Sequence, residues 1–98
     1  MRIISKKALR DFYGQYPDSE IPLESWYKTV KQAQWTCFAD IKETFNSVDY
    51  VGNKRYVFNV KGNDYRIVAI LQFTIKAVLI RFVGTYPQYD KIEDIKNI

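Results

Sequence analysis

Residues 54–73, which decide the fold, read KRYVFNVKGNDYRIVAILQF. Apolar and polar residues alternate on both sides of Gly62-Asn63, which predicts two strands, 54–60 and 65–73, joined by a two-residue hairpin turn. Such a turn fixes the register, because a shift of one residue would move every side chain to the opposite face. The expected cross-strand pairs are Val60 with Tyr65, Asn59 with Arg66, Phe58 with Ile67, Val57 with Val68, and the oppositely charged Lys61 with Asp64.

A third strand is predicted over residues 77–85, after a tight turn at Ile75-Lys76. This turn would place Phe82 beside Ala69 and Thr85 beside Arg66. Alternate residues of the three strands then fall on two faces of one sheet. One of these faces is wholly apolar and is the expected core: Phe58, Ile67, Ala69, Leu71, Phe73, Val78, Ile80 and Phe82.

The other face carries three arginines and an asparagine among small residues: Arg55, Val57, Asn59, Arg66, Val68, Ile70, Arg81, Val83 and Thr85. Guanidinium groups on neighbouring strands repel one another unless an anion lies between them. In the expected register, Arg66 and Arg81 lie about 14 Å apart, from four residues of strand rise and one step between strands. This spacing fits successive phosphates, so we expect a face that binds a polyanion. A basic face that is merely solvated is the alternative.

Amphipathic segments that can cover the apolar face precede the hairpin. Residues 2–4 are short enough for an edge strand, and apolar residues at helical spacing follow them. Three helices are predicted: one capped by Ser5 and ending before Pro17, one with Pro22 in its first turn and ending near Gln34, and a short one ending near Asn46.

These elements predict an α+β fold, with N-terminal helices packed on one face of a small mixed, mostly antiparallel sheet. A chain of 98 residues supports one core, so we expect a single domain over residues 1–98. Cys37 lies among the aromatic residues of the third predicted helix, where we expect a buried and inert thiol.

Composition narrows the possible chemistry. The chain has one cysteine and no histidine, which excludes an internal disulfide, a cysteine-built metal site and a histidine base. The apolar runs are far shorter than the roughly 20 residues of a membrane span. The first residues turn polar too early for a signal peptide, so we expect a cytoplasmic protein. The net charge is +4, and residues 51–85 hold six basic residues and one acidic residue.

The residues that remain suit RNA cleavage. No glycine-rich phosphate loop and no acidic cluster for a metal ion is present. RNA supplies its own 2′-hydroxyl as the nucleophile, so the protein needs no metal or other cofactor. It only has to position the RNA, neutralise the charge of the phosphate and transfer protons. Arginine neutralises phosphate through bidentate hydrogen bonds. Tyrosine or lysine would move the protons; with reference pKa values of about 10, tyrosine can serve as an acid unshifted.

Four parts of the chain together carry a resemblance to a known family: Met1–Asp11, Ile41–Tyr50 (IKETFNSVDY), Arg55–Ala69 (RYVFNVKGNDYRIVA), and Ile80–Thr85 (IRFVGT) with Tyr89–Ile92 (YDKI). In order, and over nearly the whole chain, they resemble the HigB family of RelE-like toxins. The resemblance implies a type II toxin, a metal-independent endoribonuclease that cuts mRNA, typically in the ribosomal decoding site. It also implies a HigA-like antitoxin with a helix-turn-helix domain that holds the toxin inactive.

The resemblance implies roles for individual residues. Arg66 and Arg81 match the sheet arginines proposed in the family to hold the scissile phosphate. Lys54 or Arg55 matches a basic residue beside it, so we expect Lys54 to be an auxiliary base or a phosphate ligand. Tyr89 matches a tyrosine of the tail. The expected RNA contacts are Arg55, Asn59 and Thr85.

One position departs from the family pattern. After Gly84-Thr85 the family usually has a histidine, whereas this chain has Tyr86. Either Tyr86 or Tyr89 then serves as the general acid, or Tyr86 only packs over the sheet edge and the toxin is weak. Two further alternatives stay open. The sheet binds RNA or the antitoxin without cutting, or its arginines are only ion-pair partners for acidic antitoxin residues.

Overall fold

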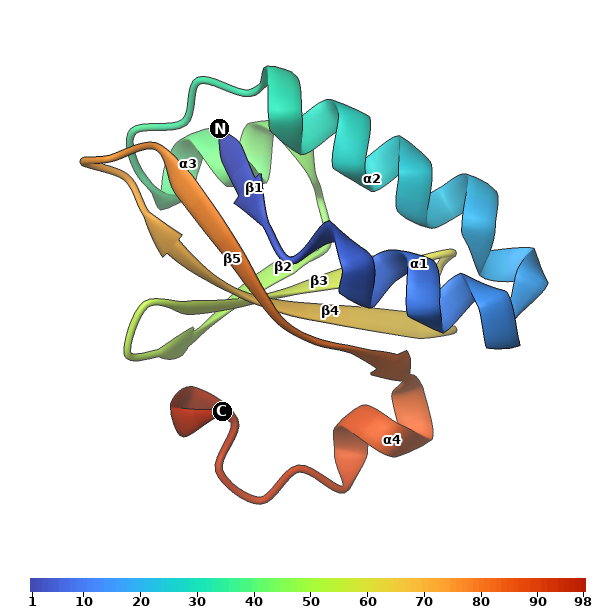
Figure 1. The fold of residues 1–98 in the computed structure, drawn as a ribbon. Coiled ribbons are helices and arrows are strands. Elements are labelled where there is room, and N and C mark those ends of the chain that lie inside the picture. Colours follow the sequence, from blue (N-terminus) through green and yellow to red (C-terminus); the bar gives the residue numbers. More distant parts are fainter.

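The computed structural model describes all 98 residues and is built around one five-stranded sheet (Figure 1). The strands lie in the order β1-β5-β4-β3-β2. β1 is parallel to β5 and the other neighbours are antiparallel, which confirms the predicted mixed, mostly antiparallel sheet. The bounds are β1 (Arg2–Ile4), β2 (Val48–Gly52), β3 (Arg55–Val60), β4 (Tyr65–Gln72) and β5 (Ala77–Thr85).

The N-terminal helices lie together on one side of the sheet, as predicted (Figure 1). Pro22 stands in the first turn of its helix, where its missing N–H costs no hydrogen bond. Ser5 has a left-handed conformation, with φ of 77°, and makes no side-chain capping bond, so the predicted Ser5 cap is wrong. The helices are α1 (Lys6–Gln15), α2 (Glu20–Gln32), α3 (Phe38–Thr44) and α4 (Tyr86–Asp90), with 3₁₀ turns η1 (Pro17–Ser19) and η2 (Ile95–Asn97). None of them is long and apolar enough to cross a lipid bilayer.

The core lies between these helices and the apolar face of the sheet. Phe58 is 1% exposed and is surrounded by the rings of Trp26, Trp35 and Phe45, with centroids 5.3, 6.4 and 5.5 Å away. Such aromatic contacts add to the free energy gained from burial. Cys37 is exposed, which contradicts the predicted buried thiol: it precedes α3 in an extended conformation, outside the ring cluster.

The register of β3 and β4 is the predicted one. Val60 faces Tyr65, Asn59 faces Arg66 and Phe58 faces Ile67. The N–H of Asp64 donates to the carbonyl oxygen of Lys61 at 3.2 Å across the turn, and the two side chains form an ion pair at 3.8 Å. Lys54, however, was predicted to begin this strand and lies just outside β3. With Asn53 it forms the turn between β2 and β3, and both residues have positive φ, as a type I′ hairpin turn requires.

The predicted register of β4 and β5 is wrong. The connection is a four-residue loop, so Gln72 faces Ala77, and the register shifts where Val68 faces Phe82 and Ala69 faces Ile80. Arg81 is the extra residue of this β-bulge, which interrupts the alternation of side chains along β5. As a result, Gly84 faces Arg66 and Thr85 faces Tyr65.

The bulge also changes which residues reach the core. Val83 packs against the core cluster although the sequence predicted it on the other face, and Phe82 is not part of that cluster. The remaining predicted core residues are buried or partly buried there: Phe58, Ile67, Ala69, Leu71, Phe73, Val78 and Ile80.

The second face of the sheet is not open. Figure 1 shows α4 and the C-terminal segment running on the side opposite α1 and α2, and Val57 and Val68 are only 2% and 0% exposed. The segment is tied to the β2–β3 turn, because Asn53 Nδ2 donates to the carbonyl oxygen of Lys96 at 3.0 Å. The C-terminal segment therefore covers much of the aliphatic floor that the sequence predicted to be exposed.

Candidate active site

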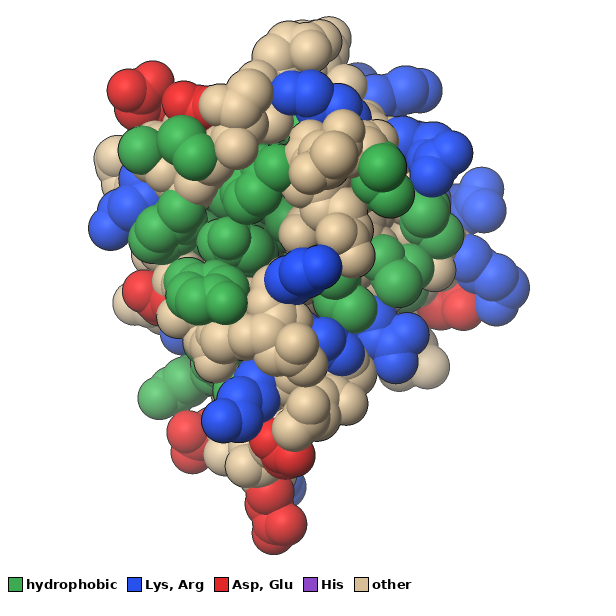
Figure 2. Space-filling view, turned by 90° about the vertical axis from the view of Figure 1, so that its left-hand side faces the viewer, with side chains coloured by type: hydrophobic (Ala, Val, Ile, Leu, Met, Phe, Trp, Pro, Cys, Tyr) green, Lys and Arg blue, Asp and Glu red, His purple; other side chains and the backbone are tan.

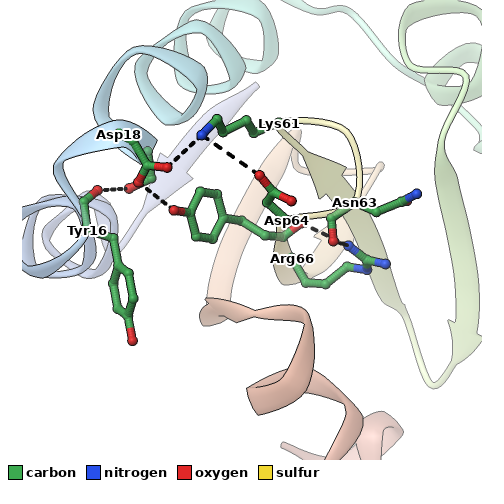
Figure 3. A network of polar contacts seen from close by, with 8 residues as sticks. Tyr16, Asp18, Lys61, Asn63, Asp64 and Arg66 are labelled. Carbon is green, nitrogen blue, oxygen red and sulfur yellow. Dashed lines mark hydrogen bonds and ion pairs between the residues drawn. The ribbon is translucent and has the colours of Figure 1, made fainter.

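Arg66 lies on the face opposite α1 and α2 and is 8% exposed. Its NH1 donates to the carbonyl oxygens of Asn63, at 2.9 Å, and Tyr65, at 3.2 Å; the bond to Asn63 is visible in Figure 3. Its Cζ lies 4.7 Å from the ring centroid of Tyr86 and 5.8 Å from that of Tyr89. Arg66 takes part in no ion pair. A nearly buried guanidinium without a counter-ion attracts an anion strongly.

Helix α4 supplies the two rings. It begins with a capping box, in which the Thr85 hydroxyl accepts the N–H of Gln88 at 3.2 Å and Gln88 Oε1 accepts the N–H of Thr85 at 2.9 Å. Tyr86 and Tyr89 are three residues apart, so they project from the same side of the helix. The N–H of Tyr86 donates to the carbonyl oxygen of Asp64 at 3.0 Å, which ties α4 to the β3–β4 turn.

Gly84 allows this close approach of α4 to the sheet. A Cβ at this position would lie 2.8 Å from Cε2 of Phe82 and 2.9 Å from Oε1 of Gln88. The Phe82 ring therefore lies against the glycine, and the capping glutamine lies beside it.

The two tyrosines differ in their surroundings. Burial, together with the negative charge of Asp49, raises the pKa of Tyr89, and the nearby Arg66 guanidinium only partly offsets this rise. Tyr86 is 47% exposed. At neutral pH the Tyr89 phenol consequently keeps its proton, which suits a proton donor and not a base.

The other predicted cations lie farther along the sheet. Arg81 is exposed at the bulge. It stands three residues before Gly84, the partner of Arg66, so the two arginine Cα atoms are roughly 11 Å apart. The predicted spacing of about 14 Å came from the wrong register.

The structure does not bring Lys54 to Arg66. Lys54 Nζ donates to Oε1 of Gln72 at 3.3 Å, and Gln72 is six residues from Arg66 along β4, a distance of roughly 20 Å. Figure 2 shows this end of the molecule: basic side chains stand among hydrophobic ones, and acidic side chains gather at its upper left and lower edges.

The predicted RNA contacts are already engaged within the chain. Arg55 NH2 donates to the backbone oxygen of Ile98 at 2.7 Å, and its buried Nε has no acceptor. Asn59 Nδ2 donates to the Ser47 hydroxyl at 2.5 Å. The Thr85 hydroxyl serves as the helix cap. Arg66, Tyr86 and Tyr89 thus form one cluster, with Arg81 nearby and Lys54 roughly 20 Å away along the sheet.

Asp49 lies on the face that carries Arg66 and was not among the residues predicted from the sequence. It lies on β2, a strand that was not predicted, and faces Val57. Val57 in turn faces Val68, next but one to Arg66 along β4, so Asp49 belongs to the same face. Two signals for β2 were available in the sequence. Apolar and polar residues alternate before the turn, and Asn53-Lys54 can form a hairpin turn, although this pair favours such turns less strongly than Asn-Gly does.

A polar network holds the β3–β4 turn beside Arg66 (Figure 3). The Tyr65 hydroxyl donates to Asp18 Oδ1 at 2.5 Å, and Lys61 Nζ donates to Asp18 Oδ2 at 2.6 Å. The hydrogen bond to Asp18, helped by burial, raises the pKa of Tyr65 to about 12. The bonds from Lys61 and Tyr65 lower the pKa of Asp18. Because the turn carries Asn63, this network also fixes the carbonyl oxygen that Arg66 binds.

The cluster does not lie in an enclosed pocket. A hollow of about 450 Å³ is lined by residues of α2, α3 and their connection, and no hollow in the structure is lined by Arg66, Tyr86 or Tyr89. No group of three or more acidic or thiol side chains is arranged to hold a metal ion. A basic surface without an enclosing pocket favours an extended anionic polymer over a small enclosed ligand.

Comparison with known proteins identifies the family of this chain. Residues 19–92 match the HigB_toxin family, described as the RelE-like toxic component of a toxin-antitoxin system. Over 93 residues the chain is 36% identical to the mRNA interferase toxin HigB of Escherichia coli (strain K12), covering 92% of this chain and 88% of that protein. Over 94 residues it is 29% identical to the mRNA interferase HigB of Escherichia coli O6:H1 (strain CFT073), covering 94% and 91%.

The α+β fold, with its mostly antiparallel sheet, and the match over residues 19–92 define the class: RelE-like toxins of toxin-antitoxin systems. Within this class, the chain belongs to the HigB toxin family. The family resemblance read from the sequence is therefore confirmed.

Proposed function

We propose that this protein is a toxin that cleaves mRNA as a metal-independent endoribonuclease. The observation that carries the proposal is Arg66, a nearly buried guanidinium without a counter-ion between a β-turn and two tyrosine rings. The relatives named mRNA interferases, at 29% and 36% identity, support it.

In the proposed reaction, the RNA 2′-oxygen attacks the adjacent phosphorus and the bond to the 5′-oxygen breaks. Arg66 and Arg81 hold the non-bridging oxygens and stabilise the charge of the pentacoordinate state. Tyr89 gives its proton to the departing 5′-oxygen, since its raised pKa keeps the phenol protonated. Tyr86 is the second candidate for this acid. The products are a 2′,3′-cyclic phosphate and a 5′-hydroxyl.

The remaining predicted residues act on flanking nucleotides in this proposal. Lys54, roughly 20 Å from Arg66, is too distant for the scissile phosphate and suits a phosphate several nucleotides away. Arg55, opposite Ile70, lies between these points, and Asn59 lies opposite Arg66. Thr85 contributes by capping α4, because its hydroxyl already accepts a backbone N–H.

We further propose that cleavage takes place in the cytoplasm on ribosome-bound mRNA, and that a HigA-like antitoxin with a helix-turn-helix domain blocks the Arg66 surface. Both partners are inferred from the family resemblance. In a purified translation system, transcripts should be cut with ribosomes present and left intact without them. Addition of the helix-turn-helix protein encoded beside the toxin gene should stop the cleavage.

The test of the proposed function is induced expression with mapping of transcript ends. Wild-type protein should arrest growth and leave cut mRNA, whereas Arg66→Ala should do neither. Arg10→Ala, which removes an exposed charge on α1, should behave as wild type. Intact transcripts with wild-type protein would contradict the proposal.

The same experiment separates a second candidate, a module that binds RNA or antitoxin without cutting. The rings of Tyr86 and Tyr89 lie over the Arg66 guanidinium and would have to move before a phosphate could reach it. This cover favours the candidate that does not cut. A pure binder leaves transcripts whole yet still forms the complex with the antitoxin. Loss of that complex in Arg66→Ala, with no cleavage by wild type, would show that the arginine is only an ion-pair partner.

A further inference from the structure

The proposed reaction needs a group that removes the proton of the attacking 2′-hydroxyl. The chain contains no histidine, and arginine, lysine and tyrosine side chains ordinarily keep their protons at neutral pH. The raised pKa of Tyr89 makes that phenol a still poorer acceptor. A carboxylate is the side chain of this chain that is ordinarily unprotonated at neutral pH and able to accept the proton.

Asp49 is placed to be this carboxylate. In the sheet it faces Val57, Val57 faces Val68 and Val68 faces Phe82, so the four residues form one row across the face that carries Arg66. Asp49 is exposed, and its carboxylate takes part in no ion pair. It is therefore accessible to a substrate lying on this surface.

The charges of both Arg66 and Asp49 act on Tyr89. The Tyr89 ring centroid is 5.8 Å from Cζ of Arg66. Among nearby charges, Asp49 has the largest effect on the Tyr89 phenol and raises its pKa, while Arg66 lowers it. The electrostatic fields of Asp49 and Arg66 therefore both reach the phenol. A phosphodiester bound by Arg66 beside Tyr89 lies on the face of the sheet from which Asp49 projects.

The other acidic residues near the site are less suitable. Asp18 and Asp64 both pair with Lys61, at 2.6 and 3.8 Å, and serve the β3–β4 turn. Asp90, in α4, follows Tyr89 directly, yet its charge affects the phenol less than that of Asp49. Asp90 is therefore the rival to test.

We infer that Asp49 is the general base of the proposed cleavage, an assignment that rests on the proposed function. The Asp49 carboxylate takes the 2′-hydroxyl proton as the 2′-oxygen bonds to phosphorus. The phosphorus–5′-oxygen bond breaks, and that oxygen takes a proton from the tyrosine acid. Solvent then returns a proton to the phenolate and removes one from Asp49, so that protons balance over the cycle.

The decisive measurement is the single-turnover cleavage rate of ribosome-bound mRNA by purified variants, alongside RNA affinity and thermal unfolding. Asp49→Asn should cleave about 100- to 10,000-fold more slowly, the usual range for a lost general base. Its RNA affinity and unfolding midpoint should stay near wild type, because the side chain is exposed. Asp49→Glu should recover part of the rate, and Asp90→Asn should stay within a few-fold of wild type.

Dependence on pH and on the leaving group separates a base from a merely structural residue. The charged groups on the same face of the sheet as Asp49 are Arg55 and Arg66, and the charges of Asp49 and Asp90 both act on the Tyr89 phenol of α4. The wild-type rate should fall as acid protonates the base, and Asp49→Asn should lose this acidic limb. An RNA with sulfur in place of the scissile 5′-oxygen, which needs no protonation to depart, should not rescue Asp49→Asn.

The outcomes are distinguishable. If wild type leaves ribosome-bound mRNA intact, the proposed function fails and the assignment fails with it. If wild type cleaves and Asp49→Asn cleaves equally fast, only the assignment of Asp49 is overturned. A large loss in Asp90→Asn, with Asp49→Asn active, would make Asp90 the base.

Discussion

Arg66 shows how a single residue prepares the site before any substrate arrives. A charge removed from water is costly unless hydrogen bonds or aromatic rings replace its solvation. Two backbone carbonyl oxygens and the rings of Tyr86 and Tyr89 provide that replacement. The guanidinium is thereby held in one place, so a bound phosphate need not first order a flexible side chain.

Arg81 should behave differently, because it is exposed at the bulge. Arg81→Ala should lower the cleavage rate by about 10- to 100-fold, the equivalent of one charge-assisted hydrogen bond, with little change in stability. The slope of log RNA affinity against log salt should fall by about 0.7 for one lost contact to single-stranded RNA. Single-turnover kinetics and salt titrations measure both, with Arg10→Ala as the matched control. Full activity of Arg81→Ala would remove Arg81 from the site.

The two tyrosines can be separated by removing one hydroxyl at a time. Tyr89→Phe should slow cleavage by about 100- to 10,000-fold, because the partly buried phenol is the proposed proton donor. Tyr86→Phe keeps the ring over Arg66 and should cost only a few-fold. Single-turnover rates check both variants, and the opposite pattern would assign the acid to Tyr86.

At this scale, the sequence could predict residues that lie in regular structure. Arg66 was placed on the correct face because the Gly62-Asn63 turn fixes its strand pairing. Lys54 and Asp49 could not be placed, since their positions depend on a second hairpin whose turn residues gave a weak signal. Burial of Arg66 was also not predictable, because the rings that cover it come from α4.

Strand β5 carries the largest departure from regular geometry. A β-bulge adds one residue without a distinctive composition, so nothing in Ile80-Arg81-Phe82 marks it in the sequence. Strand alternation alone therefore gave the wrong pairing for Thr85 and the wrong face for Val83. The bounds of β5, by contrast, were predicted correctly, because they depend on composition and not on pairing.

Helix α4 has five residues and depends on its cap. Thr85→Ala should remove the bond to the Gln88 N–H and cost about 1 kcal/mol locally. Tyr86 and Tyr89 would then be held less firmly against Arg66, so cleavage should fall more than global stability. Thr85→Ser keeps the capping oxygen and is the control. Chemical denaturation and cleavage rates measure the two effects, and equal rates for Thr85→Ala and Thr85→Ser would contradict this role of the cap.

Across the whole molecule, the Asp18 network joins the N-terminal helices to the hairpin that carries the site. It connects residues 18 and 65, which are far apart in sequence, and Tyr65 is only 6% exposed. Long-range contacts of this kind are invisible to local patterns. The helices and the face of the sheet that they cover could be predicted from the sequence, whereas the Asp18 network and the C-terminal segment over the other face could not.

The network predicts a loss of stability at alkaline pH. The pKa of Tyr65 is raised to about 12 in the folded chain, above the usual 10.0. Its contribution is complete below pH 10 and is lost as the pH rises from about 10 towards about 12, because the unfolded chain ionises first. The difference in free energy of unfolding between wild type and Tyr65→Phe should therefore shrink over this range. Denaturant titrations at several pH values measure it, and Tyr27→Phe, at a partly buried tyrosine of α2 outside the network, is the control. A constant difference would show that Asp18 does not bind the neutral phenol preferentially.

The exposed thiol of Cys37 has a practical consequence. As the chain's sole cysteine, it offers one attachment point for a maleimide fluorophore without any engineering. It precedes α3, on the side of the sheet away from Arg66, so a dye there leaves the guanidinium and its tyrosines untouched. Fluorescence anisotropy of the labelled protein can then follow its capture by large assemblies in real time.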